Sequence, residues 1–200
     1  QVSGFSAAPS GAGQGDANVP VLELSMQTNL NFVNIAQMRL KQTGTVATSS
    51  VPFSGDGDAS TIKVWLDNGD KVFSPTADTV IGQLAVSTSG AFSGGVALVP
   101  LNVNSIPYLT VSTGSVTLFV SADIGYTDRA GAPTLGHSVG FQLEKFADLL
   151  APNGSPIVAS PDPLLQPPVI SKTVLIAPLT VPAVSISSVG FLMKVTPRSC

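Results

Sequence analysis

Apolar and polar residues alternate along most of the chain. In residues 61–67, for example, Ile62 and Val64 fall on one face while Lys63 and Trp65 fall on the other. A period of two places successive side chains on opposite faces of a β-strand. The pattern therefore predicts strands that each turn one face toward a core. The segments that carry it are residues 21–27, 31–44, 61–67, 79–86, 94–103, 115–124 and 138–146.

The longest of these segments is open to a second interpretation. Residues 36–42 contain good helix formers, so an amphipathic helix competes with a strand here. The two-residue alternation and the Thr-Gly exit favour the strand. In that strand, one side is shared by Phe32, Ala36, Met38 and Leu40.

Short turn signals rich in Gly, Asp, Asn and Ser separate the predicted strands, and Glu and Lys are too sparse for a helical layer. Short strands at such spacing are typical of two packed antiparallel sheets. We therefore predict an all-β fold, an antiparallel Ig-like or Greek-key β-sandwich of about seven to nine strands with extended terminal arms. The chain has one cysteine, so the disulfide that pins antibody-like domains is absent.

The two ends differ in composition from the predicted sandwich of residues 20–150. Residues 1–19, rich in Gly, Ala and Ser, predict an extended arm that lies either on its own sheet or on a neighbouring subunit. Residues 151–200 form a Pro-rich and then apolar extension. Within it, residues 173–177 and 183–187 each have the character of an added strand, at an edge because prolines flank them.

Charged residues make up only 10% of the chain, and the formal net charge is −3. This balance argues against a protein that binds nucleic acid by neutralising phosphates. With one histidine and one cysteine, the chain has little material for catalysis or metal chemistry, so we expect neither an enzyme nor a tightly held cofactor. No apolar run is long enough to predict a membrane span.

The first residue, Gln1, is what remains after removal of a signal peptide in the simplest interpretation, which predicts an extracellular or cell-surface location. Cys200 has no partner for an internal disulfide. It is a free thiol, an intermolecular link or part of a longer sequence, and these alternatives stay open.

An acidic turn between two predicted strands is the strongest candidate site. Asp67, Asn68, Asp70 and Asp78 offer closely spaced oxygen atoms, and calcium prefers such ligands. The turn does not match the EF-hand pattern. In the competing interpretation, these side chains accept hydrogen bonds from their own backbone and hold a hairpin turn.

The sequence from this strand and its Asp-rich turn to the Asp78-Thr-hydrophobic-Gly passage resembles Ig-like sandwich modules of bacterial surface proteins. The resemblance covers residues 61–124, ending at the strand end Ser121-Ala122-Asp123-Ile124. It implies an Ig-like fold and, as in some of those modules, calcium at the turn.

Other candidate sites are weaker. Asp56 and Asp58 form a second acidic turn, and His137 is most simply a loop histidine because no G-x-S-x-G nucleophile motif occurs. Glu23 and Glu144 each lie in an amphipathic strand rather than as a catalytic pair. A sugar-stacking platform would need four aromatic side chains to be exposed and coplanar, namely Trp65, Tyr108, Phe119 and Tyr126. In the alternative, these aromatic side chains pack in the core or against a second layer.

These features favour an extracellular structural protein, a subunit of a filament, pilus or surface layer whose partners are copies of itself. Strand addition or arm exchange supplies the mechanism, because an arm from one subunit can pair with a sheet edge of the next. The predicted interface residues are Phe5, Thr173, Val174, Leu175, Ile176 and Ala177. The alternatives are an Ig-like module of a larger adhesin and a carbohydrate-binding module, and Ser/Thr-rich loops also suit attached glycans.

Overall fold

The computed structural model describes residues 1–29, 31–44, 57–85, 91–102, 107–126, 134–157 and 169–177. These residues form β-strands joined by turns, with one short 3₁₀ helix, η3 (Phe146–Asp148). The predicted all-β class is thus confirmed for the described part of the chain. In this part, no helix combines the length and apolar character needed to cross a membrane.

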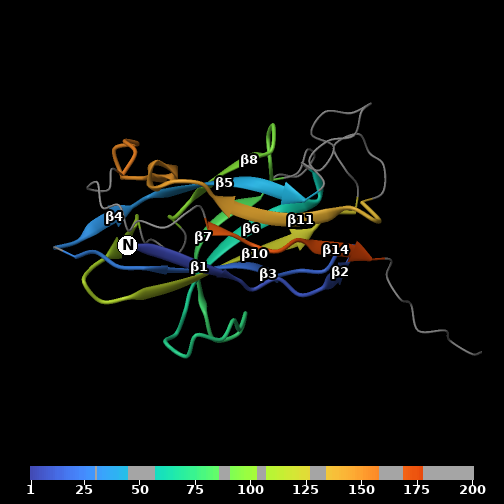
Figure 1. Ribbon diagram of the computed structural model, residues 1–200, viewed down its shortest axis with the longest axis horizontal. Helices are drawn as coiled ribbons and strands as arrows, with labels where there is room; N and C mark the ends of the chain where they lie inside the picture. Colours follow the sequence, from blue (N-terminus) through green and yellow to red (C-terminus); the bar gives the residue numbers. More distant parts are fainter. Residues whose placement is uncertain are drawn as a thin grey trace, which may run out of the picture.

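A five-stranded antiparallel sheet forms one side of the molecule (Figure 1). Its strands in spatial order are β1 (Val2–Ser6), β3 (Val19–Met26), β10 (Val116–Ile124), β6 (Ala59–Leu66) and β7 (Thr79–Ala85). We call it the first sheet. Strand β10 lies at its centre, so the long β-branched and apolar run of residues 116–124 is covered by neighbours on both edges.

The second sheet has seven strands. Its main path is β12 (Leu149–Leu150), β5 (Gln37–Gly44), β11 (Ser138–Leu143), β14 (Val174–Ala177) and β2 (Gly11–Gly13). Strand β8 (Val96–Pro100) pairs with β5, and β13 (Val169–Ile170) pairs with β11. A separate two-stranded pair joins β4 (Val33–Ile35) to β9 (Leu109–Val111). The pairing of β14 with β2 is parallel, a departure from the fully antiparallel arrangement predicted from the sequence.

The core lies between the two large sheets. Alternate residues of β6 and β10, such as Val64 and Val120, are fully buried there. From the second sheet, Met38 and Phe141 are equally buried, and the Phe141 ring lies 5.7 Å from that of Phe92. The period-two pattern of the sequence thus places alternate residues of these strands in the core, although the middle of β10 is buried on both faces.

The predicted strand 31–44 is interrupted at Ala36. The Ala36 N–H donates to the Leu150 carbonyl, and the Ala36 carbonyl accepts from the Leu101 N–H, so this residue leaves the ladders of β4 and β5. Met38 and Leu40 are buried as predicted, but Phe32 is 65% exposed, because β4 turns away to pair with β9. The prediction of a strand rather than a helix is confirmed, and the inward orientation of Phe32 is wrong.

Both ends of the described chain contribute strands to the large sheets. Strand β1 pairs with β3 along the edge of the first sheet. Its other side approaches β13: a side chain at Gly4 would meet Val169, and the Lys172 N–H donates to Ser6 Oγ at 2.9 Å. The sheets therefore extend on both sides of the 20–150 limits expected from the sequence. The other predicted strand, 183–187, lies outside the described residues.

Candidate functional site

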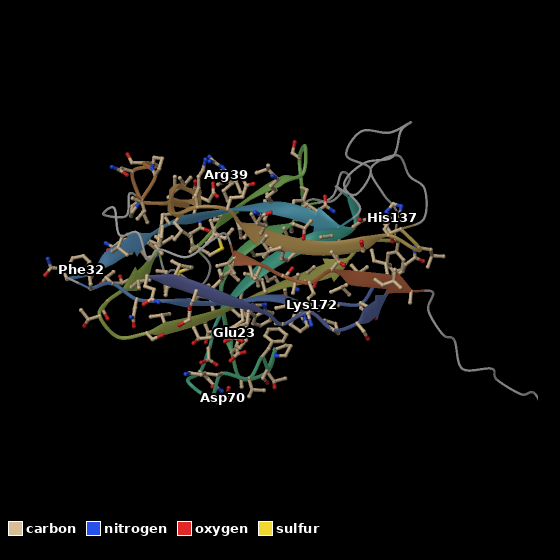
Figure 2. All side chains as sticks on the ribbon, viewed as in Figure 1. Glu23, Phe32, Arg39, Asp70, His137 and Lys172 are labelled. Carbon is tan, nitrogen blue, oxygen red and sulfur yellow. The ribbon has the colours of Figure 1, made fainter. Side chains whose placement is uncertain are left out.

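The loop between β6 and β7 covers part of the outer face of the first sheet. Figure 2 shows its acidic residue Asp70 at the far tip of the loop, beyond the sheet. Phe73 of this loop turns back onto the sheet, and its ring centroid lies 5.5 Å from those of both Trp65 and Phe119. The Trp65 Nε1–H donates to Ser121 Oγ at 2.8 Å. A second, smaller apolar cluster therefore packs outside the main core.

This cluster removes the aromatic platform that sugar stacking would need. Trp65 is 5% exposed and Phe119 is 2% exposed, both beneath Phe73. Tyr126 is exposed and Tyr108 is half-buried. The alternative weighed from the sequence, packing of Trp65 against a second layer, is confirmed.

The acidic side chains of the β6–β7 loop accept hydrogen bonds from the loop's own backbone. Asp67 Oδ1 and Oδ2 accept from the N–H groups of Lys71 and Gly69, both at 3.1 Å. Asn68 Oδ1 accepts from Asp70 N–H at 3.0 Å, and Asp70 Oδ1 accepts from Val72 N–H at 2.8 Å. Gly69 and Lys71 both have positive φ, which the tight turns of this loop require.

Asp78 closes the loop at its base. The side chain is 8% exposed, and its two oxygens accept from the N–H groups of Asn68 at 3.2 Å and Ser74 at 2.8 Å. This side chain therefore holds both ends of the loop together. Such hydrogen bonds from backbone N–H groups to an Asp side chain hold a hairpin turn together in the absence of a metal ion.

A calcium ion needs about six to eight oxygen ligands around one point. Each acidic side chain of the loop is instead directed at backbone N–H groups. In the described ranges, no three His, Cys, Asp or Glu side chains converge as a metal site would require. The residues as arranged do not fit a preformed calcium site, and calcium binding at Asp67, Asn68, Asp70 and Asp78 stays a prediction.

A second polar cluster was not foreseen from the sequence. Lys63 Nζ donates to Asn18 Oδ1 at 2.8 Å and contacts both Asp123 oxygens, at 3.0 Å and 2.8 Å. The Asn18 backbone N–H donates to Asp123 Oδ1 at 2.8 Å. The side chain of Lys63 is 17% exposed and that of Asp123 is 22% exposed. An amine, a carboxylate and an amide thus contact one another, largely shielded from water.

Sheet pairing explains how these three residues meet. Lys63 on β6 is paired with Ser121 on β10, so Asp123, two residues further along β10, projects from the same face. Val19 at the start of β3 is paired with Ala122 on the other side of β10, which places Asn18 next to Asp123. Asn18 has φ of 56°, a left-handed conformation that asparagine tolerates better than most residues. The signal in the sequence was a single charge within each of two apolar strands.

His137 contacts the second acidic turn. Its Nδ1 lies 2.7 Å from Asp58 Oδ1, and Asp58 is completely buried. The pair lies at the opposite end of the molecule from Phe32 (Figure 2). The contact joins the start of β6 to the start of β11. The other residue of this acidic turn, Asp56, lies outside the described residues. The two glutamates lie on different sheets: Glu23 is on β3 of the first sheet, and Glu144 follows β11 of the second.

The predicted interface residues fall on both faces of the terminal strands. Phe5 on β1 is 65% exposed and Leu175 on β14 is 51% exposed. Val174 and Ile176 are buried in the chain's own core, because β14 turns alternate residues inward. Thr173 is exposed just before β14, and Ala177 ends it half-buried.

The chain matches no protein-family model, and no curated protein is similar enough to indicate a relationship.

Proposed function

We propose that this chain is a non-enzymatic, Ig-like structural module of an extracellular surface assembly, joined to copies of itself through its terminal strands. The observation that supports this most directly is the position of β14. It lies between β11, with which it pairs antiparallel, and β2, with which it pairs in parallel. A strand from late in the sequence thus fills an interior position of the second sheet, and a strand from near the start covers it.

Such a strand can be exchanged between copies at little cost. Strand β14 follows the two-residue strand β13, and β13 is preceded by residues 158–168, which include Pro161, Pro163, Pro167 and Pro168. If β14 of one copy occupied the same position in the next, the backbone hydrogen bonds and the burial of Val174 and Ile176 would be unchanged. Exchange of an identical element is a low-cost route to association, and it yields open fibres when the contact does not close on itself.

The surface around the terminal strands also suits contact with another copy. Phe5 and Leu175 expose apolar side chains on opposite sheets, and Ile170 on β13 is 52% exposed. The low overall charge places few like charges in the way of such a contact. These residues would lie at the rim of the exchanged strands.

A single module of a larger surface protein is the second candidate. In Figure 1 the chain starts toward one end of the long axis, and β14 ends toward the other. Modules with this geometry can follow one another in a row. In that case the terminal strands would stay within their own chain.

Two chains with one engineered cysteine each distinguish these candidates. Ser138 on β11 is directly opposite Leu175 on β14. Cysteines at directly opposite positions of antiparallel strands are close enough to form a disulfide. In a Cys200→Ser background, Ser138→Cys and Leu175→Cys chains are mixed, refolded together and oxidised. Exchange predicts disulfide-linked dimers whose yield rises with protein concentration.

The control pair is Asn34→Cys and Thr110→Cys, which lie opposite each other on β4 and β9, away from the terminal strands. Mixed chains with these two cysteines should stay monomeric. If the Ser138→Cys and Leu175→Cys mixture also stays monomeric, while the double variant closes its disulfide within one chain, arm exchange is excluded. The single-module candidate would then replace it.

A further inference from the structure

We propose that Lys63 and Asn18 become joined by an intramolecular isopeptide bond, with Asp123 as the proton carrier. The three groups that the reaction needs are already in contact: Lys63 Nζ lies 2.8 Å from the carbonyl oxygen of the Asn18 side chain and 2.8 Å from Asp123 Oδ2. The site is independent of the terminal-strand contacts proposed above. It is a self-modification of the folded chain, with Lys63 as nucleophile and the Asn18 amide as acyl donor.

The reaction balances without any co-reactant. Asp123 accepts one proton from the Lys63 ammonium, which leaves a neutral amine able to attack the Asn18 Cγ. The new Cγ–Nζ bond forms, the Cγ–Nδ2 bond breaks, and Asp123 returns a proton to the departing nitrogen. Together with the second proton lost by Nζ, this nitrogen leaves as an ammonium ion. The product is an amide between two side chains.

The fold supplies the proximity that makes this slow reaction feasible. Well-oriented groups held in contact react as though one were present at an effective concentration of about 10⁵ M or more. Asn18 is fixed by its backbone N–H bond to Asp123, and the positions of Lys63 and Asp123 are set by the pairing of β6 with β10. The limited exposure of both charged side chains reduces competition from water for the amine and the carboxylate.

The bond would link strands that are not neighbours. Strand β3, which Asn18 immediately precedes, and strand β6, which carries Lys63, lie on opposite sides of β10. A covalent link across β10 would hold the centre of the first sheet when the chain is pulled or heated. Lys41 offers a contrast, because its Nζ lies 2.7 Å from Glu144 Oε1 in an exposed ion pair.

Peptide mass spectrometry of the folded full chain tests the proposal. Trypsin cleaves after Lys and Arg, and an acylated Lys63 resists it, so the bond would join residues 1–39 to residues 42–71 in one branched peptide. Its mass should be lower than the sum of the two peptides by about 17 Da, the mass of the ammonia released. Intact mass alone is insufficient, because cyclisation of Gln1 also releases ammonia.

Substitutions separate the bond from a simple ion pair. Lys63→Arg retains the charge without a primary amine and should abolish the branched peptide, and Asp123→Asn should greatly slow its formation. Lys41→Arg is the matched control and should leave the branched peptide in full yield. Circular dichroism confirms that each variant is folded.

Recovery of unmodified 1–39 and 42–63 peptides from folded wild-type chain, after prolonged incubation, would overturn the proposal. A branched peptide that persists in Lys63→Arg would equally overturn it, because the link would then use another residue. Failure of strand exchange does not affect this test, since the three residues lie outside the terminal strands β1, β2, β13 and β14.

Discussion

The β6–β7 loop and the Lys63 cluster use carboxylates in opposite ways. In the loop, Asp67 and Asp70 accept hydrogen bonds only from backbone N–H groups two to four residues away along the chain. Asp123 is instead held by Lys63, 60 residues away, and by the Asn18 backbone, 105 residues away. A carboxylate whose hydrogen-bond donors lie a few residues away along the chain shapes a turn. A carboxylate whose donors come from neighbouring strands brings an amine and an amide into contact. The second arrangement is the one in which a reaction between side chains is feasible.

The largest effect should follow from removal of the Asp123 carboxylate. Asp123→Ala leaves the Lys63 ammonium, which is 17% exposed, without its charge partner and the Asn18 N–H without its acceptor. We expect the free energy of unfolding to fall by about 2–3 kcal/mol relative to wild-type chain in which the isopeptide bond has not formed, somewhat below the cost of breaking a fully buried pair. Urea denaturation measures this loss.

The same substitution in the loop is the matched control. Asp70→Ala removes an exposed carboxylate that accepts one backbone N–H, so its cost should stay within about 0.5 kcal/mol. Equal losses for Asp70→Ala and Asp123→Ala would show that the two carboxylates are alike and that the contrast drawn between them is wrong.

The attachment of the loop to the sheet should depend on an aromatic side chain more than on any carboxylate. Phe73→Ala removes the ring that lies edge-on to Trp65 and Phe119. Because Phe73 is only partly buried, we expect a loss of about 2 kcal/mol, less than for a fully buried phenylalanine. Tryptophan fluorescence should shift to longer wavelength as Trp65 becomes solvated.

Val72→Ala is the control for this change, because Val72 neighbours Phe73 but is 64% exposed. It should change neither stability nor fluorescence appreciably. If Phe73→Ala behaves like Val72→Ala, the loop is held by its hydrogen bonds alone.

Sequence periodicity predicted those strands in which apolar and polar residues alternate, because the alternation itself shows which face is buried. Segments 21–27, 61–67 and 115–124 became β3, β6 and β10, and residues 173–177 supplied β14. Strands β1 and β2 were missed because Gly, Ser and Ala show no apolar alternation, and their pairing depends on β3 and β14. Local spacing likewise revealed the acidic turn.

The Lys63 cluster could not be predicted in the same way. Its three residues are brought together by the order β3–β10–β6, which periodicity does not specify. The burial of Trp65 depends on Phe73, a loop residue whose position follows from the turn and not from any strand pattern. Both features required knowledge of which segments lie side by side.

Calcium provides a smaller and sharper test of the loop. Extracellular calcium sites bind at about 10⁻⁴–10⁻³ M. A site at the tight end of that range would gain about 2.7 kcal/mol at a concentration one hundred times its dissociation constant. Because the loop carboxylates are already bonded to backbone N–H groups, we expect the melting temperatures in about 10 mM calcium and in EDTA to agree within about 1 °C. A rise of several degrees that disappears in Asp67→Asn would establish the calcium site.

The smallest effect should come from a third kind of carboxylate, one that is distant in sequence but exposed. The hydrogen bond from Lys41 holds the pKa of Glu144 below its ordinary value of 4.5. A lowered pKa in the folded state adds stability above the unfolded pKa, and this stability is lost as the pH falls through the folded value. Wild type and Glu144→Gln should therefore have equal melting temperatures well below pH 4.5, with wild type slightly higher near pH 6. The difference should vanish in high salt, because both side chains are about half-exposed. A difference that survives high salt would mean that long-range carboxylate pairs in this fold are strong even without burial, and that shielding is not what distinguishes Asp123.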